Sequence, residues 1–458
     1  MDALVKPRTA LAQAHHQCGQ ILILLAISLT VLVGFVGLAI DSGLAYGVKA
    51  KLASAVDAAS IAGARALAEG VDDDARIAAA RSAAKAYYAA NIPAVFLGAQ
   101  RVELTDQMVS AVHDATGYWT VTVTGSVLMP VTFMRVLGFS DFPISALGQA
   151  IRRDLDIILV LDTSGSLASP AGTFTALKAA AVNFVNKFNA GANGDRVGVV
   201  SFASGGVVDV PIIKDGTRGF NKTQVINAIN ALNVSGSTAS AEGLRLALND
   251  INGVPAINRS SLRMIVFFSD GAPNDVPAIF SNGGTPVTGD LYSETSSPGT
   301  NRATRVYRHD RRDSQLGDYA NIATLPNVGF SVTGVGDVSL ASFNNRRTLT
   351  GSPYANTRCN VNKAARNMVE NVANTARSQV VKIHSIALGA AVNSLEINFC
   401  AYPASEVGSS LLKRLSNTSD SDAYNPAQPT GMYVWAENAA DLDSAFTSIA
   451  SEILRLSR

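Results

Sequence analysis

The strongest pattern along the chain is an uninterrupted apolar run near its start. Residues 21–40 read ILILLAISLTVLVGFVGLAI, without a charged side chain. At about 1.5 Å per residue a helix of this length is roughly 30 Å long, the thickness of the hydrocarbon core of a bilayer. The alternative is a cleaved secretory signal, whose apolar core is usually only about 7–15 residues long. The run therefore predicts a retained transmembrane helix over Ile21–Ile40.

Helical periodicity continues beyond this run. Leu44, Val48, Leu52 and Val56 recur at every fourth position, which is the spacing of one face of an α-helix. The pattern predicts a single helix from Ile21 to about Glu69. Its second half would either pack against copies of itself or serve as a stalk, and the pattern does not separate the two.

The next segment predicts a small α+β domain beside the membrane, over residues 41–150. Asp72–Ala90 is alanine-rich and helical in character. Arg101–Leu104 and Tyr118–Val123 have the alternation and β-branched residues of strands. Val127–Ala150 closes this unit.

From Asp154 onward, short apolar runs alternate with amphipathic segments. Continuous apolar runs are typical of strands covered on both faces, and their alternation with helices is typical of a doubly wound, mostly parallel α/β sheet. We therefore predict an α/β domain over residues 151–458. The predicted strands are Leu155–Asp162, Arg196–Ser204, Arg263–Gly271, Lys382–Gly389 and Met432–Ala436, and the predicted helices are Phe174–Asn189, Gly243–Ile251 and Ala436–Leu456.

Residues from about 273 to 380 break this alternation. Pro273–Thr300 is rich in Gly, Ser, Thr, Pro and Asn, and Arg302–Asp313 is a charge cluster. A compact α/β fold needs no connection of this length, so we predict a surface insert. The arginines would either bind an acidic partner or form a solvated face with Asp310 and Asp313, and charge runs favour the solvated face.

Composition narrows the class of protein. The chain has 458 residues, of which 47% are apolar and 16% charged, and its formal net charge is +1. Nucleic-acid binders normally have a strongly basic face, so this balance argues against a nucleic-acid partner. The three cysteines form no Cys-x-x-Cys pair, which argues against a zinc or iron–sulfur site. Cys359 and Cys400 would either form a disulfide in an oxidising compartment or remain two buried thiols.

The residues that flank the apolar run predict its orientation. Lys6 and Arg8 precede the run, and Asp41 follows it directly. Lys and Arg are more frequent on the cytoplasmic side of membrane spans. We therefore predict a cytoplasmic N-terminus over residues 1–20, with the remainder of the chain after the span outside the cytoplasm.

Three short pieces of sequence carry the candidate chemistry. Asp162, Ser164 and Ser166 follow the first predicted strand of the α/β domain, Thr238 precedes a predicted helix, and Asp270 follows another strand. Ligands in open α/β sheets bind beyond the carboxyl ends of the strands. The five side chains offer only hydroxyl and carboxylate oxygens, which selects Mg²⁺, with Mn²⁺ or Ca²⁺ as alternatives. Taken alone, Asp-x-Ser-x-Ser is more typical of a turn that caps the next helix.

The N-terminal region resembles a known family. The sequence GQILILLAISLTVLVGFVGLAIDSGLAY, followed by KLASAVDAASIAGA and later by PVTFMRVLGFSDFPISALGQA, resembles TadE/TadG-like proteins. These are bitopic components of bacterial tight-adherence (Flp) pilus machineries. Gly19 precedes the apolar run as in pilin-like leaders, but the fifth residue after it is Leu24 rather than Glu. Cleavage by a prepilin peptidase is therefore not expected.

The three chemical pieces resemble the metal-ion-dependent adhesion site (MIDAS) of von Willebrand factor A domains, which have a Rossmann-type fold. All five positions of that motif are present. The resemblance implies that Ser164, Ser166 and Thr238 ligate the ion directly or through water. It implies that Asp162 and Asp270 act mostly through water and hydrogen bonds. In such a site the ion captures an acidic side chain of a protein partner.

The chain is not expected to be an enzyme. It contains no G-x-S-x-G, H-E-x-x-H or G-x-x-x-x-G-K-[ST] motif. His384 lies within an apolar run and is predicted to be a core residue, and no sequence feature indicates a raised pKa for Asp162 or Asp270.

The two resemblances together predict a single-pass protein of the bacterial inner membrane with its C-terminal head in the periplasm or cell envelope. It would bind other pilus or secretion components, in pilus assembly or cell adhesion. The alternative is a pseudopilin-like scaffold whose metal site is only structural.

Overall fold

The computed structural model describes residues 18–67, 73–113, 118–191, 194–293, 301–342, 346–393, 400 and 406–457. They fall into two units, which are described separately. The first comprises residues up to 62, 82–110 and 122–149, and the second comprises 63–81, 111–121 and 150–458. Lys6, Arg8 and the predicted helix end at Glu69 lie outside the described residues.

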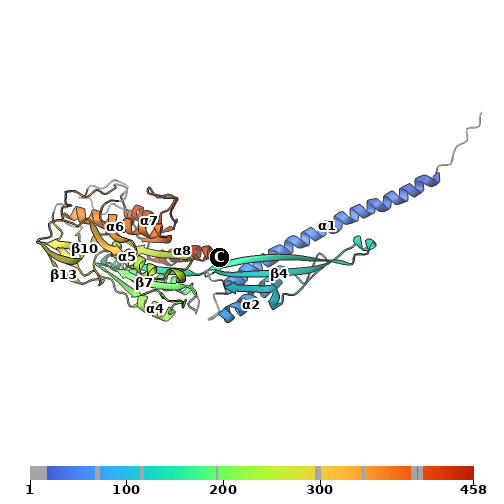
Figure 1. Cartoon of the computed structure of the whole chain (residues 1–458), viewed down its shortest axis with the longest axis horizontal. Helices are drawn as coiled ribbons and strands as arrows, with labels where there is room; N and C mark the ends of the chain where they lie inside the picture. Colours follow the sequence, from blue (N-terminus) through green and yellow to red (C-terminus); the bar gives the residue numbers. More distant parts are fainter. Residues whose placement is uncertain are drawn as a thin grey trace, which may run out of the picture. The chain divides into compact units, whose positions relative to one another are not determined.

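The first unit is built on one long helix, α1 (Cys18–Ala66) (Figure 1). Large apolar side chains from Ile21 to Ile40 are exposed, whereas Val48, Leu52 and Val56 are fully buried. The change follows the sequence, because the fourfold spacing begins where the uninterrupted apolar run ends. In the described part of the chain, α1 is the one helix long and apolar enough to cross a membrane.

A five-stranded antiparallel sheet packs on the second half of α1. It contains β1 (Val95–Phe96), β2 (Ala99–Arg101), β3 (Val109–His113), β4 (Tyr118–Pro130) and β5 (Asp141–Arg153), in the order β1-β2-β4-β3 with β5 on β4. Helix α2 (Asp73–Asn91) precedes these strands. The predicted strand Arg101–Leu104 is wrong after Arg101, where β2 ends. The sheet and α1 meet closely at Gly148, where an added methyl group would lie 2.5 Å from the carbonyl oxygen of Val56.

The turn between β4 and β5 is tied to α1 by the first charged residue after the apolar run. The Asp41 carboxylate accepts hydrogen bonds from the backbone N–H groups of Thr132 (3.3 Å), Phe133 (3.0 Å) and Met134 (3.0 Å). Asp41 is buried. A residue that reads as a simple flank of the membrane span therefore holds the end of the β4–β5 hairpin.

The second unit contains a six-stranded sheet in the order β17-β16-β9-β6-β7-β8. All neighbouring pairs are parallel except β7 and β8, which form an antiparallel edge. The central strands are completely buried because their apolar runs are covered on both faces. The strands are β6 (Leu155–Asp162), β7 (Arg196–Phe202), β8 (Gly206–Val210), β9 (Leu262–Ser269), β16 (Val381–Leu388) and β17 (Tyr433–Ala436).

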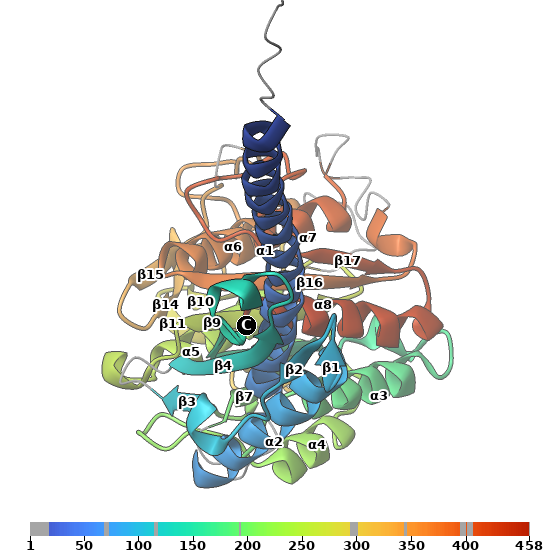
Figure 2. The same ribbon diagram turned by 90° about the vertical axis from the view of Figure 1, so that its right-hand side faces the viewer.

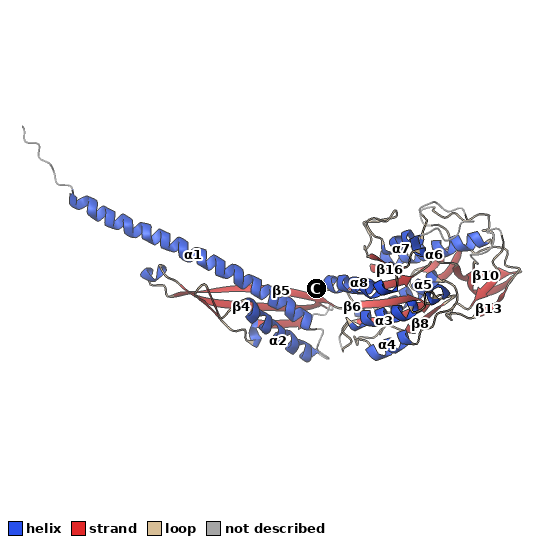
Figure 3. Ribbon diagram, turned by 180° about the vertical axis from the view of Figure 1, so that it is seen from behind, coloured by secondary structure: helices blue, strands red, loops and turns tan. Residues whose placement is uncertain are grey.

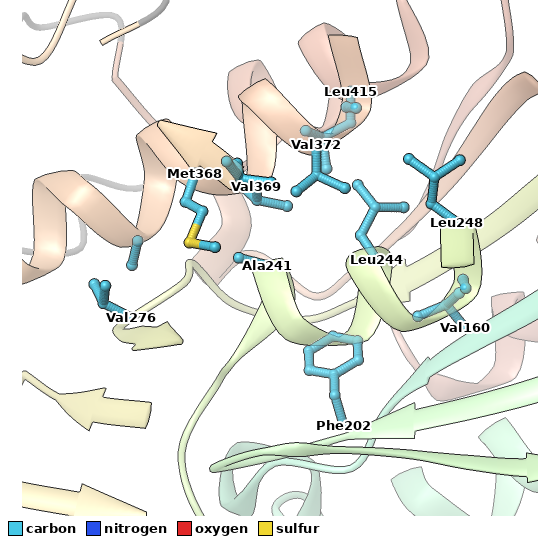
Figure 4. Packing of buried hydrophobic residues seen from close by; sticks show 14 of the residues in the cluster. Val160, Phe202, Ala241, Leu244, Leu248, Val276, Met368, Val369, Val372 and Leu415 are labelled. Atoms are coloured by element: carbon cyan, nitrogen blue, oxygen red, sulfur yellow. The ribbon is translucent and has the colours of Figure 1, made fainter. Parts of the chain in front are cut away.

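Helices cover both faces of this sheet (Figure 2). One face packs against α3 (Thr173–Asn186), α4 (Lys222–Asn230) and α8 (Leu442–Leu456), and the other against α5 (Ser240–Asn252), α6 (Arg358–Ser378) and α7 (Gly408–Ser416). In Figure 4, Met368, Val369 and Val372 of α6 face Ala241 and Leu244 of α5. The α/β prediction for this part of the chain is confirmed.

The segment predicted as a surface insert contains strands of its own (Figure 3). Four of them form an antiparallel sheet, and two form a hairpin. They are β10 (Asp275–Asn282), β11 (Thr285–Tyr292), β12 (Arg305–Tyr307) and β13 (Gln315–Asp318), then β14 (Val328–Val332) and β15 (Gly336–Ser339). Helix α6, within the same predicted range, is part of the main core. Its polar composition, with several buried Asn and Arg residues, concealed it in the sequence.

One further feature of the insert differs from the expectation. Arg312, from the charge cluster predicted to be solvated, donates to Asp209 Oδ1 at 2.8 Å and to Ser201 Oγ at 3.1 Å. The loop that carries Arg312 is therefore packed on β7 and β8.

Cys359 and Cys400, whose state the sequence left open, form a disulfide. The remaining described short helices are η1 (Asp106–Met108), η2 (Met134–Leu137), η3 (Gly165–Ala168), η4 (Ala256–Asn258), η6 (Ala391–Asn393) and η7 (Ala439–Asp441).

Candidate metal centre

Asp162 is the last residue of β6, at the carboxyl end of the sheet. Its side chain is fully buried. Oδ1 accepts a hydrogen bond from the backbone N–H of Ser164 (2.8 Å), and Oδ2 accepts one from the hydroxyl of Ser269 (2.6 Å). Asp162 therefore fixes the loop after its own strand and joins it to the end of β9.

The loops after β6 and β9 meet because these strands are neighbours in the sheet. Ser164 Oγ lies 3.1 Å from Ser166 Oγ, and the Ser166 hydroxyl donates to Asp270 Oδ1 at 2.8 Å. Ser166 is exposed and Asp270 is partly exposed. The structure thus brings four of the five predicted residues together at a solvent-accessible edge.

Thr238 lies just before α5, in a loop held against the same edge. The backbone N–H of Gly165 donates to the carbonyl of Gly236 at 3.0 Å. The N–H of Thr238 donates to Asn274 Oδ1 (2.8 Å) and to Asp275 Oδ2 (3.0 Å). The Thr238 loop therefore adjoins the Ser164–Ser166 loop through backbone contacts. No sequence pattern pointed to Asn274 and Asp275, because they follow Asp270 at no characteristic spacing.

The two carboxylates lack a cationic side chain among their described hydrogen-bond partners. Burial, and secondly the negative charge of Asp270, raises the pKa of Asp162 to about 7. Burial raises the pKa of Asp270 to about 6. Neither shift was predicted from the sequence, because both arise mainly from tertiary burial. A bound cation would stabilise the charged form of both groups.

The donor set fits a hard cation. Ser164, Ser166 and Thr238 provide hydroxyls, and Asp162 and Asp270 provide carboxylates. Mg²⁺ prefers oxygen donors and commonly keeps several waters, so it needs few carboxylates. The described residues contain no cluster of three or more His, Cys, Asp or Glu side chains suited to a metal. A metal at this edge would therefore depend on the hydroxyls.

Comparison with known families agrees with this geometry. A sequence model of the von Willebrand factor type A domain matches residues 156–283, and one described as putative Flp pilus-assembly TadE/G-like matches residues 19–66. The chain combines a TadE/G-like segment with a von Willebrand factor type A domain. Both resemblances predicted from the sequence are confirmed. The matched range of the von Willebrand factor type A domain includes all five candidate residues and ends at residue 283, directly after β10.

The solved structures to which this chain is similar include three from bacterial pili. The vWF domain of the type V pili tip protein Mfa5 from Porphyromonas gingivalis is 18% identical, with a TM-score of 0.39 over 68% of this chain and 98% of that chain. The open conformation of the pilus adhesin SpaC from Lactobacillus rhamnosus GG is 16% identical, with a TM-score of 0.39 over 78% of this chain and 36% of that chain. The PilB minor pilin from Streptococcus sanguinis is 14% identical, with a TM-score of 0.37 over 76% and 78%. No curated protein matches the chain.

Proposed function

We propose that this chain is a membrane-anchored component of Flp/Tad-type pilus assembly or adhesion that binds a protein partner through a divalent metal ion. The observation that carries the proposal is the convergence of Ser164, Ser166 and Asp270 beside the buried carboxylate of Asp162. The TadE/G-like match over residues 19–66 supports the link to pili. The exposed apolar half of α1 supports the anchor.

The proposed ion is Mg²⁺, with Mn²⁺ or Ca²⁺ as alternatives. Ser164, Ser166 and Thr238 would ligate it directly or through water, and Asp162 and Asp270 would contribute through water and hydrogen bonds. When bound, the ion supplies a positive charge that can accept an acidic side chain of the partner. Asp162 keeps Ser164 in position, and the exposed side of Ser166 leaves the site open to a macromolecule. No catalytic step is proposed.

The proposed location is the bacterial inner membrane, crossed once by residues 21–40, with the head in the periplasm or cell envelope. Two features support this orientation. Lys6 and Arg8 precede the apolar run. The disulfide between Cys359 and Cys400 is of the kind that persists in oxidising compartments.

The second candidate function is a pseudopilin-like scaffold in which the metal site is only structural. It is favoured by the 49-residue length of α1, which offers a long surface for helix packing. Tyr46, 78% exposed just after the apolar run, lies on that surface. A scaffold would tolerate loss of the metal site and would fail when a charge is placed at Tyr46.

The test is magnesium binding by calorimetry with the detergent-solubilised full chain and its Ser166→Ala variant. Ser166 is the better position because it is exposed, whereas removal of the buried Asp162 would also release Ser164 and Ser269. We expect saturable binding in the wild type and at least about tenfold weaker binding in Ser166→Ala, given the loss of one ligand. Ser169→Ala, another exposed serine of the same loop, should bind as the wild type does.

Absence of magnesium and manganese binding in the folded wild-type chain would contradict the proposed function. The scaffold would be favoured by two results together. The wild type would bind metal, and pilus assembly would persist in Ser166→Ala but fail in Tyr46→Asp.

A further inference from the structure

Two aspartates on the β10–β11 hairpin face a site that the proposed function does not use. In the antiparallel register Asp275 pairs with Tyr292, and Asp290 pairs with Pro277. Asp275 and Asp290 are therefore diagonal neighbours on one face of the hairpin. The opposite face carries Val276 and Leu291 into the main core. Both carboxylates thus lie on the side of the hairpin that points away from that core.

These carboxylates are nevertheless fully buried. Asp275 Oδ1 and both carboxylate oxygens of Asp290 have no hydrogen-bond partner among the described residues. A buried polar atom without a partner is unfavourable, since it loses its hydration without a replacement. Three unsatisfied oxygens on neighbouring side chains indicate a ligand that accepts lone pairs.

The loop after β12 covers this face and supplies further oxygens. The N–H groups of Gly205 and Gly206 donate to the carbonyls of Arg312 and His309, each at 3.1 Å. A methyl group added to Gly205 would collide with the carbonyl oxygens of Arg308 and Arg311 and lie 3.2 Å from Asp290 Oδ2. The carbonyl oxygens of Arg308 and Arg311 therefore pack closely around Gly205, beside the Asp290 carboxylate.

Positive side chains nearby are already engaged. Arg245 donates to both oxygens of Glu242, at 2.6 and 2.7 Å, and His309 Nδ1 lies 3.7 Å from Glu242 Oε1. Burial, followed by the charges of Glu242 and Asp275, raises the pKa of Asp290 well above its ordinary value. The negative charge of Glu242 is balanced, whereas the carboxylates of Asp275 and Asp290 have no cationic hydrogen-bond partner in the described structure.

We propose that Asp275 and Asp290, with the backbone carbonyls of Arg308 and Arg311, form a second cation site, distinct from the one at Ser164 and Ser166. Calcium is the cation that these donors select. It accepts backbone carbonyls together with carboxylates in a flexible shell, whereas Mg²⁺ requires near-ideal octahedral geometry and seldom occupies all-protein cages. Two carboxylates with carbonyl donors suffice, so a cluster of three acidic side chains is not required.

The second site is connected to the first through Asp275. Its Oδ2 holds the backbone N–H of Thr238 at 3.0 Å, while its Oδ1 is the oxygen without a partner. A calcium ion bound to Oδ1 would fix the carboxylate that positions Thr238. Calcium is therefore inferred to order one side of the proposed adhesion site without contacting the partner.

The test is calcium titration by calorimetry on the chelator-treated full chain in detergent, in an Asp270→Asn background that weakens the first site. We expect one equivalent of calcium to bind this protein, and we expect at least tenfold weaker binding when Asp290→Asn is added. Asp337→Asn, an exposed carboxylate in the same insert, is the matched control and should leave calcium binding unchanged.

A folded Asp270→Asn chain that binds no calcium would overturn the proposal without any Asp290 variant. Binding that is unchanged by Asp290→Asn, in a protein with wild-type circular dichroism, would also overturn it. Neither result bears on magnesium binding to the wild type, so the first site stands or fails separately.

Discussion

His384 is an ionisable residue at the centre of the main sheet. It lies on β16 and is fully buried. Its Nδ1 accepts a hydrogen bond from the backbone N–H of Met432 at 3.1 Å, and its Nε2 has no partner among the described residues. Burial, followed by the charge of Lys382, lowers the pKa of His384 to about 3. The histidine is thus neutral in the folded head at neutral pH. Its burial confirms the sequence prediction of a core residue.

Neutral His384 should make the head sensitive to acid. The unfolded state takes up a proton below pH 6.5, whereas the folded state does not until pH approaches 3. Above pH 6.5, His384 therefore does not lower the free energy of unfolding. Below pH 6.5, the free energy of unfolding falls by about 1.4 kcal/mol per pH unit because of this residue. Between pH 7 and 5 we expect the free energy of unfolding to fall by about 2 kcal/mol more in the wild type than in His384→Asn. Urea denaturation at both pH values measures this difference.

Asparagine is the suitable replacement because its side-chain oxygen can accept the Met432 N–H and it does not titrate. Equal losses of stability in the two proteins between pH 7 and 5 would show that His384 is not the acid-sensitive group.

At the scale of elements, the contact between α1 and its sheet depends on a missing side chain. The backbone of α1 at Val56 lies directly against Gly148 of β5. No side chain fits between them, so helix and strand approach more closely than larger residues would allow. The alternating apolar positions of β4 provide the rest of the packing face.

Gly148→Ala should therefore destabilise the first unit by about 1–3 kcal/mol, which is the usual cost of overpacking. The added methyl group would meet backbone atoms of α1, which cannot rotate away as a side chain can. Gly43→Ala on the same helix is the control, because a methyl group there has no neighbour within 4 Å and alanine favours the helix. In detergent, the unfolding temperature of Gly148→Ala should be lower than that of the wild type. The unfolding temperature of Gly43→Ala should be equal to that of the wild type or higher. A Gly148→Ala chain as stable as the wild type would contradict this contact.

The helices and strands differ in how well they can be predicted from the sequence. Strands β6 and β9 were predicted closely, because continuous apolar runs have few alternatives in an α/β chain. Helix α6 was missed, because its buried face includes Asn360, Asn367 and Arg366, whose hydrogen bonds are made to distant segments. A hydropathy pattern cannot register burial that depends on such tertiary partners.

At the scale of the whole molecule, the disulfide joins α6 of the core to a distant part of the chain. Cys359 and Cys400 are separated by 41 residues. Cross-linking over such a loop typically contributes about 2–4 kcal/mol. We expect the Cys359→Ser, Cys400→Ser double variant to unfold at a lower temperature than the wild type. Cys18→Ser, which leaves both partners in place, should behave as the wild type does.

The measurement is thermal unfolding of protein exported to an oxidising compartment, with thiols counted before and after reduction. Three free thiols in the unreduced wild type would contradict the disulfide and, with it, one support for the proposed location of the head.

The sequence predicted which residues form the candidate site, but it did not predict the residues that hold them in place. Asp162, Ser164, Ser166 and Asp270 follow strand ends, and parallel strands that are neighbours in the sheet bring such ends together. Asn274 and Asp275, which hold Thr238, lie at the start of a hairpin whose strands are outside the main sheet. Their role depends on how that hairpin folds back, and no local pattern encodes it.

The continuity of α1 has a mechanical consequence. The helix passes from its exposed apolar half to the half packed under the sheet with no break between Cys18 and Ala66. A hinge is therefore missing at the point where the proposed anchor emerges from the lipid. A rotation of the span about the helix axis would therefore also rotate the sheet that is packed on α1. A single residue inserted after Asp41 would rotate the two halves relative to each other by about 100°.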